Sequence, residues 1–176
     1  MVFRDTHLNG AFVVELEERQ DSRGFFARSY CQREFSEHGL DPKVVQCNIS
    51  FNLARGTLRG LHFQAPPYEE AKLVRCTSGA IYDVIIDLRE DSRTRFQHFA
   101  VRLDARNRWM LFVPKSFAHG FITLEDHTEV FYQMSEFYAP NSASGFRWND
   151  PAFQIEWPLE PAVMSEKDRN YRDFGQ

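Results

Sequence analysis

Apolar and polar residues alternate in short segments along nearly the whole chain, and these segments are rich in β-branched and aromatic residues. Alternation with a period of two is typical of strands that are buried on one face. Turn-forming residues such as Pro66-Pro67 and Ser78-Gly79 separate many of the segments. The predicted strands are Gly10–Leu16, Phe25–Cys31, Val44–Phe51, Thr57–Gln64, Ala71–Ser78, Ala80–Leu88, Phe96–Leu103, Trp109–Val113, Phe121–Leu124, Thr128–Ser135 and Gln154–Trp157.

Helix signals are few in this sequence. The stretch Arg33–His38 is closed by Gly39, which is typical of a helical turn that ends at glycine. Ser165, followed three residues later by Asp168, resembles the start of a second, capped turn. Many strands at spacings of about 8–16 residues and almost no helix predict an antiparallel sandwich or barrel. No repeat, low-complexity tract or linker divides residues 1–176, so we expect a single domain.

One predicted strand, Ala80–Leu88, places a carboxylate among apolar residues. With a period of two, Asp83 shares a face with Ile81 and Ile85. A carboxylate on an inward face is costly unless it has a partner. We therefore expect Asp83 to be paired or to have a function.

His62 lies in the predicted strand Thr57–Gln64, on the same face as Gly60. A glycine inside a strand often marks a bulge or the close approach of a ligand. A lone histidine in such a strand is about as often a core residue satisfied by a hydrogen bond as a functional one. Two other ionisable residues on strands, Lys72 and Tyr132, favour a functional role for His62. Taken singly, however, a lysine at the end of a strand is usually solvated, and a tyrosine in a strand is usually a core residue.

Composition and charge argue against several classes of protein. The chain has 176 residues, with 21 Lys and Arg against 25 Asp and Glu and a formal net charge of −4. This balance does not support a nucleic-acid partner, which would need a basic face. Charges interrupt residues 1–20 and the apolar stretches are short, so we expect neither a signal peptide nor insertion into a membrane. Cys31, Cys47 and Cys76 have no paired close spacing, which favours reduced thiols and a cytoplasmic protein.

A metal site is one alternative for these residues, because jelly-roll barrels often hold one. A common arrangement uses His-x-His, a Glu a few residues later and a further His. Here the first element is His62-Phe-Gln64, so the second ligand would be an amide, and only Glu69 or Glu70 and His119 could complete the set. Two imidazoles without matched carboxylate spacing make a poor set of ligands. We therefore expect no catalytic metal.

A set of short motifs spans nearly the whole chain, and together they are specific. They are Asp21–Phe26, Gly56–Gln64, Lys72–Arg75, Asp83–Arg89, Phe117–Phe121, Trp148–Pro151 and Ser165–Asp168. In these motifs and their order the chain resembles the dTDP-4-dehydrorhamnose 3,5-epimerase family. The resemblance implies an all-β, cupin-type jelly-roll barrel with short peripheral helices and an isomerase that uses no metal or cofactor. It also implies a nucleotide-sugar substrate and a homodimer whose N-terminal strands extend a neighbour's sheet.

The resemblance implies roles for individual residues. His62 matches the general base, Asp168 the carboxylate that pairs with it, and Asp83 an acidic residue near that base. Lys72 matches a lysine near the 4-keto oxygen of the sugar, and Tyr132 the acid on the opposite face. The residues expected to contact sugar, phosphates or base are Arg23, Phe26, Gln46, Asn48, Arg59, His119 and Tyr138. Regular alternation places Arg59 opposite His62, so this set needs a bend, which Gly60 would permit.

The implied reaction suits these residue types. A proton on C3 or C5 beside a 4-ketone is acidic because its removal gives an enolate, and histidine is a suitable base near neutral pH. A lysine can stabilise the negative charge that develops on the 4-oxygen. A tyrosine hydroxyl can return a proton to the other face. The net charge of −4 requires a local cluster of cations for an anionic substrate, for which Arg23, Arg59 and Lys72 are candidates.

Several alternatives remain open at the level of the sequence. Ala27-Arg28 and the stretch Asn48–Asn52 depart from the usual pattern of the family near the nucleotide or sugar. A GDP- or CDP-linked sugar is therefore an alternative to a dTDP-linked one, and inversion at C3 or C5 alone is an alternative to inversion at both. A non-catalytic sugar-binding barrel and a metal-dependent cupin oxygenase are the alternatives from other classes. Of the 17 phenylalanines, we expect Phe25, Phe26 and Phe121 to line or support the sugar pocket.

Overall fold

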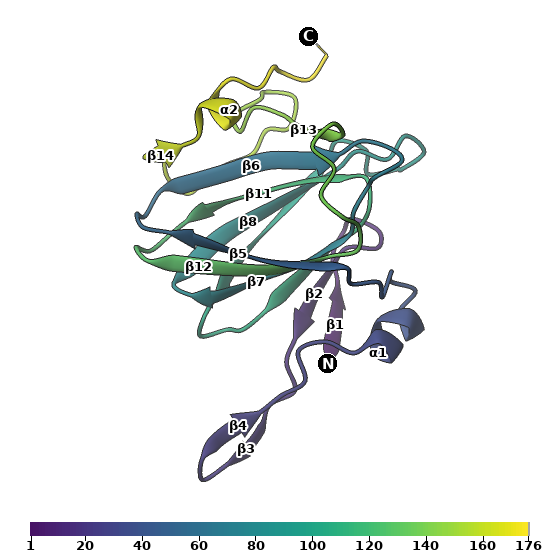
Figure 1. The fold of residues 1–176 in the computed structure, drawn as a ribbon, viewed down its shortest axis with the longest axis vertical. Helices are drawn as coiled ribbons and strands as arrows, with labels where there is room; N and C mark the ends of the chain where they lie inside the picture. The colour runs from purple at the N-terminus through teal and green to yellow at the C-terminus, as the bar shows by residue number, and fades with distance from the viewer. Residues whose placement is uncertain (176) are drawn as a thin grey trace.

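The computed structural model of the protein describes residues 1–175. Two six-stranded sheets face each other, and a separate two-stranded hairpin extends away from them (Figure 1). This arrangement of antiparallel strands is the jelly-roll barrel that the resemblance implied. The strands are β1 (Val2–Asp5), β2 (Phe12–Glu15), β3 (Arg19–Asp21), β4 (Gly24–Phe26), β5 (Gln46–Asn52), β6 (Thr57–Gln64), β7 (Lys72–Ser78), β8 (Ala80–Asp87), β9 (His98–Asp104), β10 (Met110–Val113), β11 (Phe117–Thr123), β12 (Thr128–Met134), β13 (Ala143–Gly145) and β14 (Val163–Met164). The two short helices are α1 (Gln32–Glu37) and α2 (Glu166–Arg169).

The strand order explains which elements border the space between the sheets. The first sheet has the order β1-β2-β10-β7-β12-β5, and the second has β13-β6-β11-β8-β9 with β14 added parallel to β6. Strands β5 and β6 follow each other in the sequence but belong to different sheets. They lie along the same side of the barrel, where β14 and α2 cover β6 (Figure 1).

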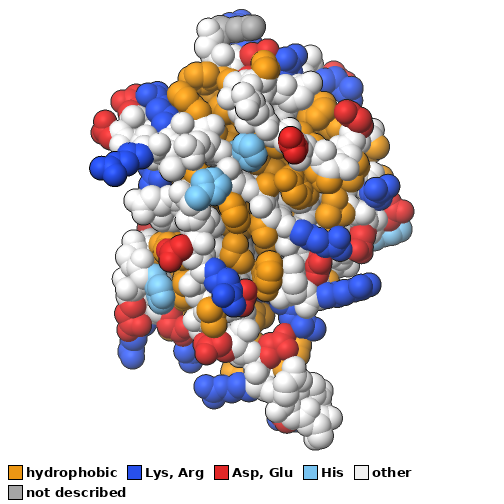
Figure 2. Space-filling view, turned by 180° about the vertical axis from the view of Figure 1, so that it is seen from behind, with side chains coloured by type: hydrophobic (Ala, Val, Ile, Leu, Met, Phe, Trp, Pro, Cys, Tyr) orange, Lys and Arg blue, Asp and Glu red, His pale blue; other side chains and the backbone are white. Residues whose placement is uncertain are grey.

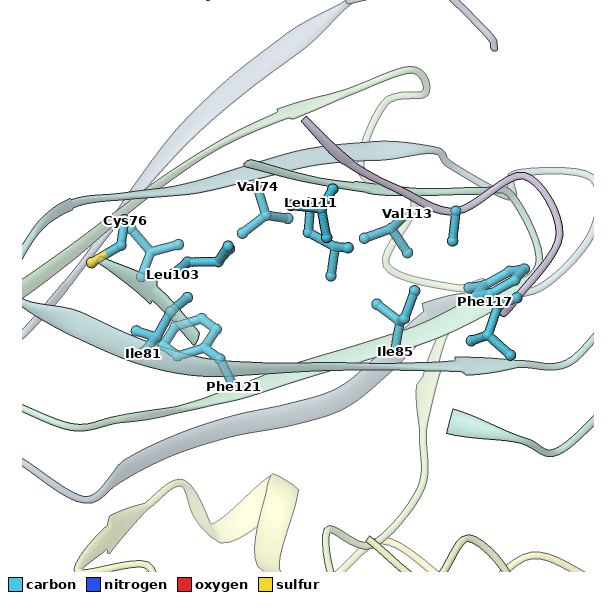
Figure 3. Packing of buried hydrophobic residues seen from close by; sticks show 13 residues of the cluster. Val74, Cys76, Ile81, Ile85, Leu103, Leu111, Val113, Phe117 and Phe121 are labelled. Atoms are coloured by element: carbon cyan, nitrogen blue, oxygen red, sulfur yellow. The ribbon is translucent and has the colours of Figure 1, made fainter. Parts of the chain in front are cut away.

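The core lies between the two sheets and uses the inward residues of both. Val74, Leu111 and Val113 of the first sheet point toward Ile81 and Ile85 of the second (Figure 3). Each of these side chains is at most 1% exposed. Their burial removes apolar surface from water, which is the main contribution to the stability of such a barrel.

The predicted strand Ala80–Leu88 is buried on both faces, and its Ile81 and Ile85 belong to the core between the sheets. Asp83 is fully buried together with Ile81 and Ile85, so the expected inward face is confirmed. The predicted helical turn Arg33–His38 is confirmed as α1, whose Phe35 is buried against the outer face of the first sheet.

The predicted strands differ from the observed ones in several places. Gln154–Trp157 forms no strand, because Gln154 has a φ of 49° in the left-handed region, which an extended chain does not adopt. Of the predicted Phe25–Cys31, only Phe25 and Phe26 lie in a strand, β4. The strand Val2–Asp5 was missed, since its side chains are largely exposed and show no alternation with an apolar face.

Charged side chains of both signs are interspersed on the face seen from behind, where hydrophobic side chains also reach the surface (Figure 2). No field of one sign covers that face. Within residues 1–175, none of the helices has the length and apolar character needed to cross a membrane.

Candidate active site

A cavity of about 1000 Å³ opens between the two sheets, on the side where β5 and β6 lie. Its walls come from both sheets, and β14 and α2 contribute to its rim. A pocket of this size holds a ligand larger than a simple sugar. Most of the site residues expected from the sequence line it. They are Gln46, Asn48, Arg59, His62, Lys72, His119, Tyr132, Tyr138 and Asp168.

His62 and Asp168 form a hydrogen-bonded pair in this cavity. The distance from His62 Nε2 to Asp168 Oδ1 is 2.6 Å. Asp168 is 4% exposed and lies in α2, where its own N–H donates to the Ser165 hydroxyl at the start of the helix (3.0 Å). The capped turn predicted from Ser165 and Asp168 is therefore confirmed, and it is what holds the carboxylate against the imidazole.

Asp168 is held in its ionised form by its donors. Burial by itself would raise the pKa of its carboxyl, but hydrogen bonds from His62, the Gly60 N–H and Ser165 hold the pKa below its ordinary value. The partner of His62 is thus an anion at neutral pH. An anion at this position can orient the imidazole and stabilise the positive charge that forms when a histidine base takes a proton.

Gly60 provides the bend that brings Arg59 and His62 to the same cavity. Its φ is 134°, and the register between β6 and β11 shifts at this point, between the pairs His119–His62 and Phe121–Arg59. A Cβ atom at Gly60 would lie 2.5 Å from the Cα of Gly120. Only glycine fits this conformation and this close approach, so the predicted bend is confirmed.

A second histidine–carboxylate pair lies beside the first. His119 Nε2 is 2.7 Å from Asp83 Oδ1, and His119 lies across from His62 in the register of β11 and β6. Asp83 is fully buried and does not line the cavity. The carboxylate that was expected near the base therefore contacts the neighbouring histidine. His119 lines the cavity, and Asp83 lies behind it.

Lys72 and Tyr132 line the cavity from the sheet opposite His62. Lys72 Nζ is 2.8 Å from Glu70 Oε1. Burial raises the pKa of the Tyr132 hydroxyl; the positive charge of Arg59 partly opposes this and the negative charge of Glu70 adds to it. The tyrosine is thus protonated at neutral pH and is able to donate a proton.

Two expected contact residues do not reach the cavity of their own chain. Arg23 and Phe26 lie on or beside the β3–β4 hairpin, which extends away from the barrel (Figure 1). The Arg23 side chain is 87% exposed and pairs with Asp21, and Phe26 is 71% exposed. Phe25 lies on the same hairpin, whereas Phe121 lines the cavity as expected.

Of the ionisable side chains that line the cavity, three were missed by the sequence analysis. Lys167 and Tyr171 line the rim near Asp168, and Glu70 lines the wall beside Lys72. Lys167 stands next to Asp168 in the motif Ser165–Asp168, so its position was a signal that could have been used. For Glu70, the sequence pattern indicated only a poor metal ligand. Over the residues that the structure describes, no three His, Cys, Asp or Glu side chains gather around a common point suited to a metal ion, and the absence of a catalytic metal stays a prediction.

Comparison with known proteins places the chain in a family. The family model described as dTDP-4-dehydrorhamnose 3,5-epimerase matches residues 5–176. The dTDP-4-dehydrorhamnose 3,5-epimerase of Methanothermobacter thermautotrophicus is 44% identical over 173 residues, which cover 97% of this chain and 92% of that protein.

Solved structures agree in fold as well as in sequence. The crystal structure of the dTDP-4-dehydrorhamnose 3,5-epimerase of Bacillus anthracis, with TDP and PPi bound, is 42% identical with a TM-score of 0.94 and covers 98% of both chains. The enzyme of the same name from Elizabethkingia anophelis is 37% identical with a TM-score of 0.96, covering 99% of this chain and 96% of that one. With a barrel of the same shape and a family model that matches nearly every residue, the chain belongs to the dTDP-4-dehydrorhamnose 3,5-epimerase family.

Proposed function

We propose that the protein is an isomerase that inverts C3 and C5 of a dTDP-linked 4-keto-6-deoxyhexose through an enolate. One observation carries this proposal: a histidine paired with a buried carboxylate and a protonated tyrosine line one cavity from opposite sheets. Inversion needs a base on one face of the sugar ring and an acid on the other, and this arrangement supplies both. The names of the relatives support the same reaction and the same nucleotide.

In this reaction His62 removes the proton next to the 4-ketone, and the negative charge of Asp168 stabilises the imidazolium that forms. The electrons of the broken C–H bond move into the ring, and charge develops on the 4-oxygen. The ammonium of Lys72 stabilises that charge. The Tyr132 hydroxyl then gives a proton to the same carbon from the opposite face. Exchange with solvent afterwards removes the proton from His62 and returns one to Tyr132.

The rest of the cavity binds the nucleotide. Arg59 and Lys167 line it and, within residues 1–175, take part in no ion pair, so their charges are available for a diphosphate. Tyr138 is 55% exposed at the rim, where an aromatic ring can stack on a base. Gln46 and Asn48 supply amide groups for hydrogen bonds, and His119, held by Asp83, supplies an imidazole.

Turnover in deuterated water tests the reaction. With dTDP-4-keto-6-deoxyglucose as substrate, we expect deuterium at both C3 and C5, followed by mass spectrometry and NMR. His62→Ala should abolish exchange at both carbons while dTDP still binds. Label at one carbon only would show a monoepimerase, a reaction named for a relative from Streptomyces bikiniensis that is 30% identical. Exchange that persists in His62→Ala would refute the proposed base, and binding without exchange in the wild type would favour a sugar-binding barrel.

A separate binding experiment tests which nucleotide the cavity prefers. We expect dTDP to bind more tightly than GDP, CDP or UDP in a calorimetric comparison. Tighter binding of another nucleoside diphosphate would change the substrate without changing the mechanism.

We also propose that the protein works as a homodimer in which Arg23 and Phe26 reach the substrate in the partner's cavity. Two exposed features support this. The hairpin that carries these residues extends from the barrel (Figure 1). The edge strand β5 and its end also expose large apolar side chains, with Ile49 64%, Phe51 50% and Leu53 71% exposed. An exposed apolar edge strand readily accepts another chain.

A further inference from the structure

Glu70 and Lys72 form a buried ion pair in the cavity wall. Their side chains are 5% and 9% exposed, and the distance from Lys72 Nζ to Glu70 Oε1 is 2.8 Å. Lys72 is the first residue of β7, and Glu70 lies in the loop just before it. Both residues line the cavity.

Within residues 1–175, the two side chains make no ion pair with a third residue. The second carboxylate oxygen, Glu70 Oε2, is buried and has no hydrogen-bond partner within residues 1–175. The charge of Glu70 also acts on Tyr132, since it adds to the rise in the pKa of that hydroxyl. The negative charge of Glu70 is therefore directed mainly at the ammonium of Lys72.

Stability alone does not account for such a pair. Burying two charges carries a desolvation cost that their attraction often fails to offset, and a well-packed apolar pair in the same place is frequently as stable or more so. A buried ammonium, on the other hand, remains charged only beside an anion. The pair is thus suited to keeping a cation in a dry wall of the cavity, which is where the reaction needs one.

We propose that Glu70 is a positioning residue for catalysis: it fixes the Lys72 ammonium toward the 4-oxygen of the substrate. This inference rests on the proposed epimerase function. The geometry explains why the carboxylate does not simply cancel the lysine. One oxygen fixes one of the three ammonium protons, and the others stay available to the enolate oxygen as its charge develops.

The first test is Glu70→Gln, compared with Glu69→Gln as a matched control. Glu69 is the adjacent carboxylate and does not line the cavity. Glutamine keeps the size of the side chain and an oxygen acceptor but removes the charge. We expect kcat to fall by about 10- to 100-fold, the usual cost of losing a partner that orients a functional group, with little change in KM or in dTDP binding. Glu69→Gln should behave like the wild type, and an unchanged kcat in Glu70→Gln would overturn the proposal.

A double-mutant cycle separates positioning from a purely structural role. Lys72→Met should lower kcat by itself, and adding Glu70→Gln to it should change kcat by less than about twofold, because the residue through which Glu70 acts is gone. A further large loss in the double variant would show that Glu70 acts elsewhere, for example through Tyr132 or the fold, and would overturn the proposal.

A readout that needs no turnover distinguishes this inference from the function it rests on. The NMR signal of the Lys72 ammonium, assigned by its loss in Lys72→Met, should shift or broaden in Glu70→Gln and not in Glu69→Gln. If the wild type shows that dependence but no exchange of substrate protons, the proposed function fails while the ion pair stands. If the signal is the same in Glu70→Gln and the wild type, the positioning role fails whatever the activity.

Discussion

Two buried carboxylates in this molecule have similar surroundings and different tasks. Asp168 and Asp87 are each held by several donors, which keep their pKa values below the ordinary range. Asp168 faces the cavity and its main partner is the imidazole of His62. Asp87, at the end of β8, does not line the cavity and pairs with Arg89, Ser92 and Thr94. Surroundings of this kind therefore indicate function only where a cavity is present.

The Asp87 cluster predicts an acid-dependent contribution to stability. Burial would raise the pKa of Asp87, but its hydrogen bonds lower it from 3.8 to about 2. Because the folded value is the lower one, the contribution is complete above the unfolded pKa and is lost as the pH falls toward about 2. We expect Asp87→Asn to lower the free energy of unfolding at pH 7 by about 2–4 kcal/mol, as measured with urea.

The same variant should differ less from the wild type at pH 2–3 than at pH 7. Asp91→Asn, at an exposed position of the same turn, should change stability little at either pH. A cost for Asp87→Asn that does not depend on pH would contradict the assignment.

Individual residues were predicted well where their chemistry stands out from the local pattern. Asp83 among isoleucines and His62 beside a strand glycine are conspicuous because neither fits an ordinary core strand. Glu70 is different, since a glutamate in a loop after Pro66-Pro67 is an ordinary surface residue until the loop is seen to fold against the cavity. Its partner lies two residues away, but the burial of the pair is a tertiary property that no local pattern carries.

At the scale of elements, strand β6 depends on one glycine. Gly60 permits both the bend and the contact with Gly120, and this allows Arg59 and His62 to line the same cavity. Most strands with a buried apolar face were predicted with bounds close to those observed, because alternation follows burial. The exception is β11 (Phe117–Thr123), which is buried along its whole length but was predicted only from Phe121. The β3–β4 hairpin and β1 have no such buried face within one chain, so their sequences show no alternation from which the strands could be predicted.

Substituting Gly60 tests this dependence. We expect Gly60→Ala to destabilise the protein by several kcal/mol, on the order of the largest single-residue effects, because its Cβ would lie 2.5 Å from Gly120 Cα. Gly24→Ala is the matched control, since Gly24 has a similar φ of 127° but no atom within 4 Å of an added Cβ. Thermal unfolding measures both. Equal losses in the two variants would mean that backbone strain, and not the close approach of β11, sets the cost.

At the scale of the whole molecule, the proposed exchange of hairpins makes each cavity a product of two chains. This leads to a complementation test with two inactive variants, Arg23→Ala and His62→Ala. In a mixed dimer, the cavity with an intact His62 receives an intact Arg23 from its partner. After subunit exchange in an equal mixture, we expect about a quarter of the wild-type activity, since half of the dimers are mixed and each has one complete cavity.

If Arg23 served the cavity of its own chain, the mixture would contain no complete site and would stay as inactive as its components. Size-exclusion chromatography of each variant checks that both still form dimers. Lys167→Ala, mixed with His62→Ala, is a control of the opposite kind: both residues line the cavity of one chain, so we expect no recovery.

The carboxylate partner of His62 does not come from the barrel strands that hold the base. It comes from the segment after β13, which crosses over the sheet, adds β14 to β6 in parallel and ends in α2. A polypeptide emerging from the ribosome can therefore form both facing sheets, with most of the wall of the cavity, before it has made Asp168. Formation of the two sheets and formation of the His62–Asp168 pair are therefore separate steps. Removal of the segment by proteolysis would take away the partner of His62, and it would also uncover Leu61, Ile86 and Ala118, against which Phe153 packs.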